Sequence, residues 1–323
     1  RVKRPSADMI DGFLLGILSA VSFGLSDSLA IFSARRIGTI KTAAGALLVS
    51  LVCVGLYALV VGSSFPTDPS VVLAIGGLGV FHGISYFAFI QALRLGPVSV
   101  VAPVSATSGA VTVLMAVLLL GEQPHLIQWL GVPLTAAGAV LAAARFEKPD
   151  RQRRSIGPGL AFTVITVLAY GAYTVGLPSA IRAAGWVQTV FISRGLSAVL
   201  AWVALLVLLG GAGARATSGR PGSTDRHGFV LLGGSSSAWT KTVALIAPPA
   251  ALLIVLGGLN ALGQLTRALA LETAPAWLVG LVVSTSPAAV LATAVLVLHE
   301  RVGPAQWLGI GLIIAGLALV AAG

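Results

Sequence analysis

Long apolar runs that carry almost no charge restrict this chain to one environment. Runs of roughly twenty apolar residues recur along all 323 residues, and only 9% of the residues are charged. A soluble domain of ordinary composition has about 25% charged residues, which cover the surface that faces water. We therefore expect an all-α integral membrane protein. The composition excludes a soluble enzyme, a nucleic-acid-binding module and a disordered scaffold.

Charged residues, prolines and glycines bound the apolar runs and predict ten transmembrane helices, because a helix needs about 20 residues to cross a bilayer. The predicted helices of the first half are 12–32, 42–61, 71–93, 98–120 and 126–144. Those of the second half are 159–177, 187–209, 243–271, 275–298 and 306–322.

The two halves of the chain are related in sequence. A shift of 178 residues aligns 121–143 with 299–321. The identities at this shift include Glu122 with Glu300, Gln128 with Gln306, Trp129 with Trp307, Gly131 with Gly309, and Gly138 with Gly316. The same shift pairs Thr107-Ser108 with Thr285-Ser286. Shared apolar composition does not explain a Glu and a Gln-Trp pair in one register, so we infer a duplication.

The duplication predicts two repeats of five helices each. The first repeat is 1–144, a polar basic linker follows at 145–158, and the second repeat is 159–323. Because five is an odd number, the second repeat enters the membrane from the opposite side. Inverted repeats of this kind are the common construction of secondary transporters.

Each repeat has a small-residue helix that ends in Glu, followed by a Trp-Leu-Gly helix with a late Gly. These stretches, 92–141 and 268–320, resemble the EamA family of the drug/metabolite transporter superfamily. The resemblance implies a central cavity lined by the first, third and fourth helices of each repeat, with the fifth helices at the periphery. Arg194 resembles an Arg often found in the second helix of a family repeat, and the aligned residue of the first repeat is Leu47.

Polar side chains inside the predicted spans indicate a substrate site, because a polar group at bilayer depth needs a partner or a function. His82 lies at the middle of the third span, and Tyr86 and Phe89 share its helix face. This face predicts a cavity wall in which His82 binds substrate and carries a proton. The alternative is a neutral histidine that a neighbouring hydroxyl or carbonyl satisfies.

Asn260 and Gln264 form a second polar pair, in the corresponding helix of the second half. Their amides suit a neutral or zwitterionic ligand, or else join neighbouring helices. Aromatic and hydroxyl side chains complete the predicted lining: Tyr170, Tyr173, Ser105, Thr107, Ser108, Ser284, Thr285 and Ser286. For the hydroxyls the alternative is close helix packing, as in Gly12-x-x-x-Gly16 and Gly79-x-x-x-Gly83.

Few charges fall within the predicted spans. Asp27 lies five residues before the predicted end of the first helix and is interpreted as a proton or cation site, a hydrated helix end or a partner of Arg194. Arg194 is the one cation expected at depth, and Arg267 is assigned to the side of the termini. Glu122 and Glu300 are expected to anchor equivalent helix ends near the N-termini of the following helices.

The net charge of +10 is spread over the predicted loops, which indicates topology and not nucleic-acid binding. The positive-inside rule places the termini outside, whereas relatives of the family are usually drawn with both termini in the cytoplasm. The orientation in the plasma or inner membrane therefore stays open.

These observations predict a secondary transporter that moves a small neutral or zwitterionic, amino-acid-like metabolite across the bilayer by alternating access. A dianionic sugar phosphate would need paired Lys or Arg. No catalytic, metal-binding or phosphate-loop motif is found, so we expect no enzyme activity, cofactor or metal. We expect a proton as the coupling ion. Proton-coupled export is preferred, with an uptake permease and a non-transporting scaffold or assembly subunit as alternatives.

Overall fold

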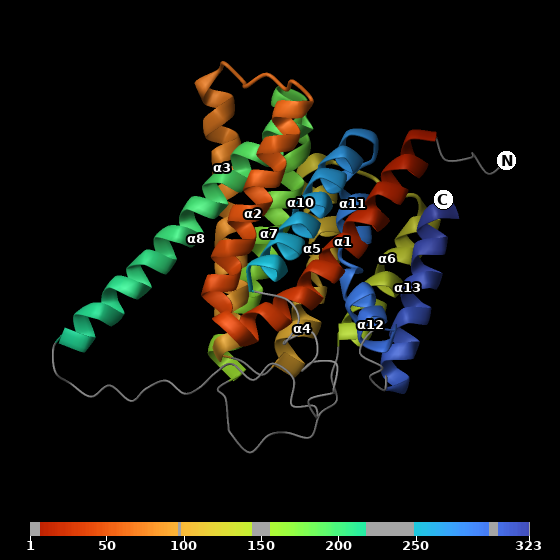
Figure 1. Cartoon of the computed structure of the whole chain (residues 1–323). Helices are drawn as coiled ribbons and strands as arrows, with labels where there is room; N and C mark the ends of the chain where they lie inside the picture. The colour runs from red at the N-terminus through yellow and green to blue at the C-terminus, as the bar shows by residue number, and fades with distance from the viewer. Residues whose placement is uncertain (1–6, 96–97, 144–155, 218–248, 297–302, 323) are drawn as a thin grey trace.

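The computed structural model consists of helices joined by short loops in the residues that it describes, which are 7–95, 98–143, 156–217, 249–296 and 303–322 (Figure 1). The first half contains α1 (Ala7–Ile37), α2 (Thr39–Val60), α3 (Pro69–Leu95), α4 (Val98–Ala106), α5 (Ser108–Met115), a π-helical turn (Ala116–Leu120) and α6 (Leu126–Ala143). The second half contains α7 (Ile156–Ala184), α8 (Trp186–Thr217), α10 (Pro249–Thr273), α11 (Ala276–Val283), α12 (Ser286–Leu296) and α13 (Pro304–Ala322).

Within the described ranges, nine helical segments are long and apolar enough to cross a membrane. The chain is therefore a multi-pass membrane protein, as predicted. The predicted span at 275–298 is a shorter apolar unit, found as α11 and α12. The total of ten spans accordingly stays a prediction.

Two helices that were expected to be continuous are interrupted at aligned positions. The expected helix at 98–120 is broken at Thr107, and the one at 275–298 is broken at Ser284 and Thr285. Each threonine hydroxyl donates to a carbonyl oxygen three residues earlier, at 2.7 Å for Thr107 to Val104 and at 2.6 Å for Thr285 to Val282. The backbone nitrogens of Thr107 and Thr285 donate to the same two carbonyl oxygens at 3.1 Å, so the chain makes a tighter turn with i to i+3 hydrogen bonds at each break.

Contacts between α1 and α10 resemble those between α3 and α7. In both pairs the helices are antiparallel, and a serine hydroxyl of the first half donates to a carbonyl oxygen of the second half. The paired residues are Gly12 with Ala274 and Ser19 with Gly263 for α1 and α10, and Leu78 with Gly176 and Ser85 with Thr166 for α3 and α7. In the relation between the two halves, α1 corresponds to α7 and α3 corresponds to α10, so the two pairs of helices are equivalent.

The remaining contacts connect these pairs and fix the direction of each helix. Helix α2 runs parallel to α10, α3 runs parallel to α8, and α2 is antiparallel to α8. For α2 and α10 the contacts are Gly45 with Leu253 and Val49 with Gly257. For α3 and α8 they are Gly79 with Ser193 and Gly83 with Leu200. For α2 and α8 they are Gly55 with Phe191 and Leu51 with Gly195. It follows that α1 and α7, the first helices of the two halves, run in opposite directions.

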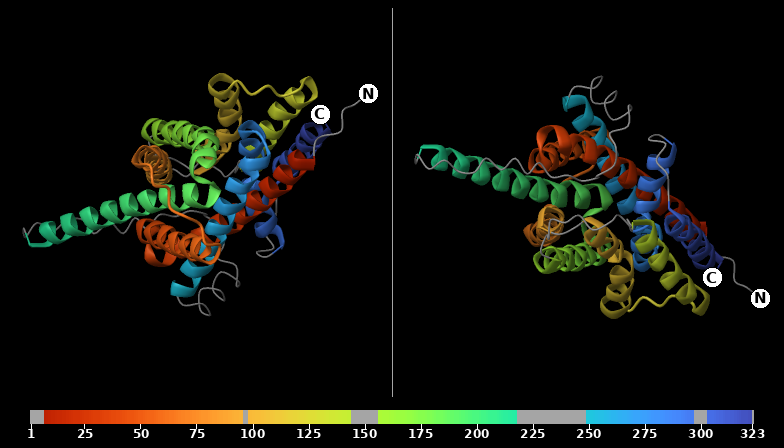
Figure 2. Two further views of the ribbon diagram at one scale, coloured as in Figure 1. Left: turned by 90° about the horizontal axis from the view of Figure 1, so that it is seen from above. Right: turned by 90° about the horizontal axis from the view of Figure 1, so that it is seen from below.

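Helices α6 and α13 pack against each other on one side of the bundle, while α8 extends beyond the opposite side (Figures 1 and 2). A Cβ atom on Gly131 would lie 2.6 Å from the carbonyl oxygen of Gly316, and one on Gly138 would lie 2.7 Å from that of Gly309. The four aligned glycines therefore permit close approach of the two helix backbones, which accounts for their identity in the two repeats.

The aligned glutamines also have one shared function. The Gln128 Oε1 atom accepts a hydrogen bond from the backbone nitrogen of His125 at 2.8 Å, and the Gln306 Oε1 atom accepts one from that of Gly303 at 3.1 Å. Each glutamine is the third residue of its helix and bonds the residue just before the helix, as in a capping box. Both α6 and α13 thus begin with the same cap.

Glu122 caps a helix in the other half of the chain. Its Oε1 and Oε2 atoms accept hydrogen bonds from the backbone nitrogens of Ala276 and Trp277, both at 2.9 Å, at the start of α11. Glu122 therefore anchors the start of a helix, as expected, but the free N–H groups that its carboxylate satisfies belong to α11 and not to the helix that follows it in the chain. Glu300 lies outside the described residues.

The substitution Gly138→Val is expected to reduce the free energy of unfolding by about 1–3 kcal/mol, because backbone atoms of Gly309 and Ile313 leave no space for a side chain. The melting temperature of the purified protein in detergent measures this effect. Gly311→Val is the matched control, since a Cβ atom there meets nothing within 4 Å. Equal melting temperatures for the two variants would contradict the close packing of α6 and α13.

The substitution Glu122→Ala is expected to reduce the free energy of unfolding by about 1–2 kcal/mol, because α11 loses a charged cap. Gln123→Ala at the adjacent exposed residue is the control. Both variants are compared with the unmodified protein by thermal unfolding. A Glu122→Ala protein as stable as the Gln123→Ala protein would show that the cap does not stabilise the fold.

Candidate functional site

Seven aromatic and polar side chains gather between four helices, and we call this cluster the polar centre. It consists of His82 and Tyr86 from α3, Tyr170 and Tyr173 from α7, Arg194 from α8, and Gln264 and Arg267 from α10. Five of the residues that the sequence predicts for the substrate site therefore lie together. Helices α3 and α10, the third long helices of the two halves, both contribute.

Arg267 lies inside the bundle, which corrects its assignment to the side of the termini. Only 1% of its surface is exposed, although it lies six residues before the end of α10, about 9 Å along the helix axis. Its Nη1 atom donates to the Tyr170 hydroxyl at 3.0 Å and its Nη2 atom donates to Gln264 Oε1. The side chain turns inward to these partners and does not extend toward the membrane surface.

Three aromatic rings surround the Arg267 guanidinium. Its Cζ atom lies 4.8 Å from the ring centroid of Tyr173, 5.6 Å from that of Tyr170 and 5.9 Å from that of Phe23 on α1. Cation–π contacts of this kind partly replace the hydration that a buried guanidinium loses. Tyr170 and Tyr173 thus hold a cation of the protein itself.

Arg194 is the second buried cation, with 3% of its surface exposed. Its Nη2 atom has no hydrogen-bond partner, and its charge interacts with Tyr173, Tyr86 and Arg267. Among the described residues, no carboxylate forms an ion pair with Arg194 or Arg267. The expectation that Arg194 is the only cation at depth is therefore wrong.

Asp27 lies on α1, whose helix continues for ten residues beyond it, to Ile37. The part of this helix that is apolar enough to cross a membrane ends at Ala30, three residues beyond Asp27. Its side chain is exposed, and its charge interacts with Tyr86 of the polar centre. No ion pair joins Asp27 to Arg194 in the described part of the chain.

His82 has a hydroxyl partner and also belongs to the polar centre. Its ring packs edge-on against Tyr173, with centroids 4.9 Å apart, and is nearly parallel to Tyr86 at 6.4 Å. Its Nδ1 atom lies 3.1 Å from Ser197 Oγ, whose own proton is directed to the carbonyl oxygen of Gly79 or Ser193 at 2.9 Å. Ser197 consequently accepts the bond, and His82 Nδ1 donates it.

Two other predicted site residues lie apart from the polar centre. Phe89 packs in an apolar cluster with Ala92, Val101 and Phe162. The Asn260 Oδ1 atom accepts a hydrogen bond from Ser50 of α2 at 3.5 Å, which is the helix-to-helix contact that the alternative interpretation describes.

The hydroxyl residues predicted for the lining lie at the two helix breaks, which face each other. Gly109 of α5 faces Ser284, and Gly280 of α11 faces Thr112. The Ser284, Thr107 and Thr285 hydroxyls bond backbone carbonyl oxygens three residues earlier, whereas the buried Ser105 Oγ atom has no partner. Ser108 and Ser286 are the first residues of α5 and α12. Contact of these hydroxyls with a substrate stays a prediction.

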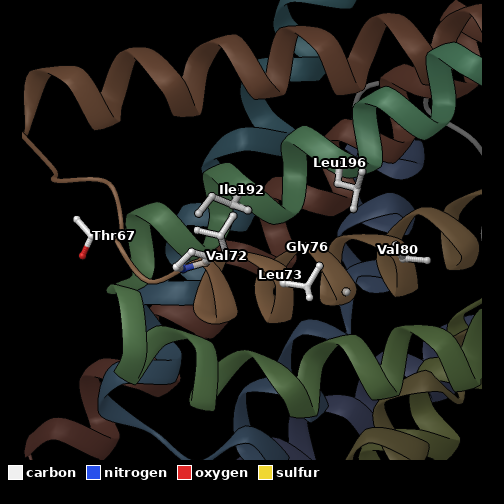
Figure 3. A pocket seen from close by; sticks show the side chains of 9 residues that line it. Thr67, Val72, Leu73, Gly76, Val80, Ile192 and Leu196 are labelled. Atoms are coloured by element: carbon white, nitrogen blue, oxygen red, sulfur yellow. The ribbon is translucent and has the colours of Figure 1, made fainter.

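A groove of about 810 Å³ lies between α3 and α8, away from the polar centre (Figure 3). Apolar residues and glycines line it, apart from Thr67: Pro69, Val72, Leu73, Gly76, Gly77, Val80, Ile192 and Leu196. Such a lining is typical of a surface that contacts lipid acyl chains. No residue of the polar centre borders the groove.

The sequence contains a signal for the burial of Arg267. Asn260, Gln264 and Arg267 follow the spacing i, i+4, i+7 and therefore share one helix face. Arg267 also falls within the predicted span 243–271. A cation on the polar face of an apolar helix indicates a buried site.

Comparisons with known proteins agree with this architecture. Residues 10–144 match the model of the EamA-like transporter family. An uncharacterized transporter in the cobO 3' region of a Sinorhizobium species is 41% identical over 81 residues, which are 25% of this chain and 56% of that protein. The match thus spans little more than half the length of that relative.

A solved structure described as "Crystal structure of protein" has the same fold, with a TM-score of 0.69 and 18% sequence identity. The similarity covers 98% of this chain and 96% of that chain. The helical arrangement is thus known from experiment. Residues 10–144 of the chain are thus similar to the EamA-like transporter family, and the helical fold of the chain is that of the solved structure.

Proposed function

We propose that this protein is a secondary transporter that moves a small polar, amino-acid-like metabolite across a membrane by alternating access. The observation that carries the proposal is the polar centre, because seven polar and aromatic side chains lie inside a bundle of apolar helices. Polar and ionisable groups at this depth are expensive and mark substrate or ion pathways. A scaffold protein does not need them.

The arrangement of the helices supports the alternating-access part of the proposal. The first helices of the two halves run in opposite directions, and the contacts of one half repeat in the other after exchange. We propose two inverted repeats of five helices, with α11 and α12 together as the ninth helix. Two similar halves of opposite orientation can exchange conformations and so open a shared site to either side.

The helix breaks at Thr107 and at Thr285 support the same mechanism. They lie at aligned positions on α4–α5 and α11–α12, and they face each other where the two halves meet. Interrupted helices near the substrate site are a recurring feature of secondary transporters. A break also allows the two parts of a helix to tilt separately.

Proton coupling is part of the proposal, with His82 and Asp27 as the titrating groups. His82 lies among Tyr86 on its own helix, Tyr173 on α7, Arg194 on α8 and Arg267 on α10. Its charge state consequently affects every polar helix of the site. We propose proton antiport in the direction of export, and the transport experiment below also tests uptake.

The test is transport by the purified full-length protein in liposomes with an imposed pH gradient. We expect members of a mixed pool of amino acids and other small metabolites, measured by mass spectrometry, to accumulate against their gradients. The accumulation is expected to collapse when an ionophore removes the pH gradient. Absence of solute movement in either direction would reject the transporter proposal, and accumulation that is indifferent to the gradient would reject proton coupling.

The substitution His82→Ala is expected to lower the initial rate of transport roughly tenfold or more, because it removes a hydrogen bond and a titrating group from the polar centre. His125→Ala is the matched control, since this histidine is exposed and precedes α6. Asn260→Ala tests the second predicted polar face. An unchanged rate in His82→Ala would contradict the assignment of the polar centre as the site, and an unchanged rate in Asn260→Ala would leave Asn260 as a contact between helices only.

A further inference from the structure

We infer that Arg267 and Arg194 together bind a carboxylate group of the transported molecule. The inference rests on the proposed function and narrows its substrate to compounds with a free carboxylate. It begins from a charge imbalance within the polar centre. Two guanidinium groups are almost completely buried, and among the described residues neither has a carboxylate within ion-pairing distance.

Each of these arginines has an N–H donor without an acceptor. The Nη2 atom of Arg194 and the Nε atom of Arg267 are both buried and have no hydrogen-bond partner in the described part of the chain. A buried donor that lacks a partner is costly, and a buried unpaired charge is more so. The cost is removed when an anion from outside the protein supplies the missing acceptors and the missing negative charge.

Tyr173 connects the two cations. Its ring centroid lies 4.8 Å from the Arg267 Cζ atom, and its hydroxyl lies 3.5 Å from the Oγ atom of Ser193, the residue before Arg194. The two arginine charges also interact with each other. Like charges repel, so one anion that contacts both guanidinium groups stabilises the pair.

The charges of the site favour a carboxylate over a phosphate dianion. Arg194 and Arg267 contribute two positive charges, and Asp27, which acts on Tyr86, contributes one negative charge in its ionised form. With His82 neutral and Asp27 ionised, a single negative charge balances the site. Guanidinium groups bind carboxylates through two parallel N–H donors, which suits this ligand in geometry as well as charge.

The buried pair of cations changes which of the substrates considered from the sequence suit the site. A phosphate compound was disfavoured because only Arg194 was expected at depth, and the buried Arg267 removes that reason. The neutral polar substrates that the sequence allowed become less suitable, because they leave both guanidinium charges unbalanced. An amino acid remains a suitable substrate, since its carboxylate can bind the two arginines.

The test is binding of matched compound pools to the purified full-length protein. One pool contains the amino acids as free acids, the second contains the same amino acids as primary amides, and the third contains inorganic phosphate alone. Bound compounds are identified by mass spectrometry after equilibrium dialysis, and dissociation constants are measured for those that bind. We expect binding of free acids, with at least tenfold weaker binding of the corresponding amides.

The variants Arg267→Gln and Arg194→Gln are each expected to weaken binding of a free acid at least tenfold. Arg267→Lys is expected to have an intermediate effect, because it keeps the charge and loses the paired donors. Arg182→Gln, at an exposed arginine in the last turn of α7, is the control and should bind as the unmodified protein does. Amides that bind as tightly as acids, binding of phosphate alone, or unchanged binding in both Gln variants would overturn the inference.

A measurement without ligand separates a binding role from a structural one. Because the charge of Arg194 is unpaired, Arg194→Gln is expected to leave the melting temperature unchanged or to raise it. A fall in melting temperature together with unchanged binding would identify Arg194 as a structural residue and overturn its assignment.

Binding and transport fail independently. Free acids that bind but never cross the liposome membrane would leave this inference intact and reject the transporter proposal. Amides that cross the membrane while the acids neither bind nor cross would support the transporter proposal and reject this inference.

Discussion

Helix packing in this protein depends on close backbone contact at small residues, because lipid tails are as apolar as the helices and provide no hydrophobic drive for helix association. Gly131 and Gly138 bring α6 within reach of α13, and Gly12 does the same for α1 and α10. Serine hydroxyls then reach carbonyl oxygens of the neighbouring helix, as Ser19 does at Gly263. The close approach that small residues permit thus also places polar groups within hydrogen-bonding distance across the interface.

The same constraint explains why the duplication is visible in only part of the sequence. The aligned glycines and Gln128 with Gln306 contact backbone atoms, so substitution at these positions disturbs packing or capping directly. Lipid-facing positions need only be apolar and carry no such restriction. The repeats therefore resemble each other most where α6 and α13 begin and pack.

The approximate positions of the long helices could be predicted from the sequence, because membrane insertion depends on local hydropathy. The breaks at Thr107 and Thr285 could not, since hydropathy does not indicate where the helical hydrogen-bond pattern changes to a tighter turn. The helix that Glu122 caps could not be predicted either. Its carboxylate accepts hydrogen bonds from Ala276 and Trp277, and a contact between distant parts of the chain has no local signature.

The polar centre could be predicted only in part, because some of its residues share a helix face and others depend on contacts with other helices. His82 and Tyr86 share one helix face, and Gln264 occupies the matching face of α10, so spacing alone brings them to the interior. The depth of Arg267 depends on Phe23, Tyr170 and Tyr173, which come from two other helices. A long cationic side chain extends toward water unless such partners hold it. Phe89 has the expected spacing but finds apolar neighbours instead.

The energetics of the two buried arginines connect binding with conformational change. Each cation–π contact contributes about 2 kcal/mol when desolvated, whereas burying an ion costs several kcal/mol. The three aromatic rings and the two hydrogen bonds of Arg267 therefore offset much of this cost. Arg194 has less compensation because its Nη2 donor is unsatisfied among the described residues. A ligand shifts a conformational equilibrium only by its difference in affinity for the two states. An anion that relieves this imbalance in one state and not in the other would supply such a difference, so the charges that bind the substrate would also favour the conformation that encloses it.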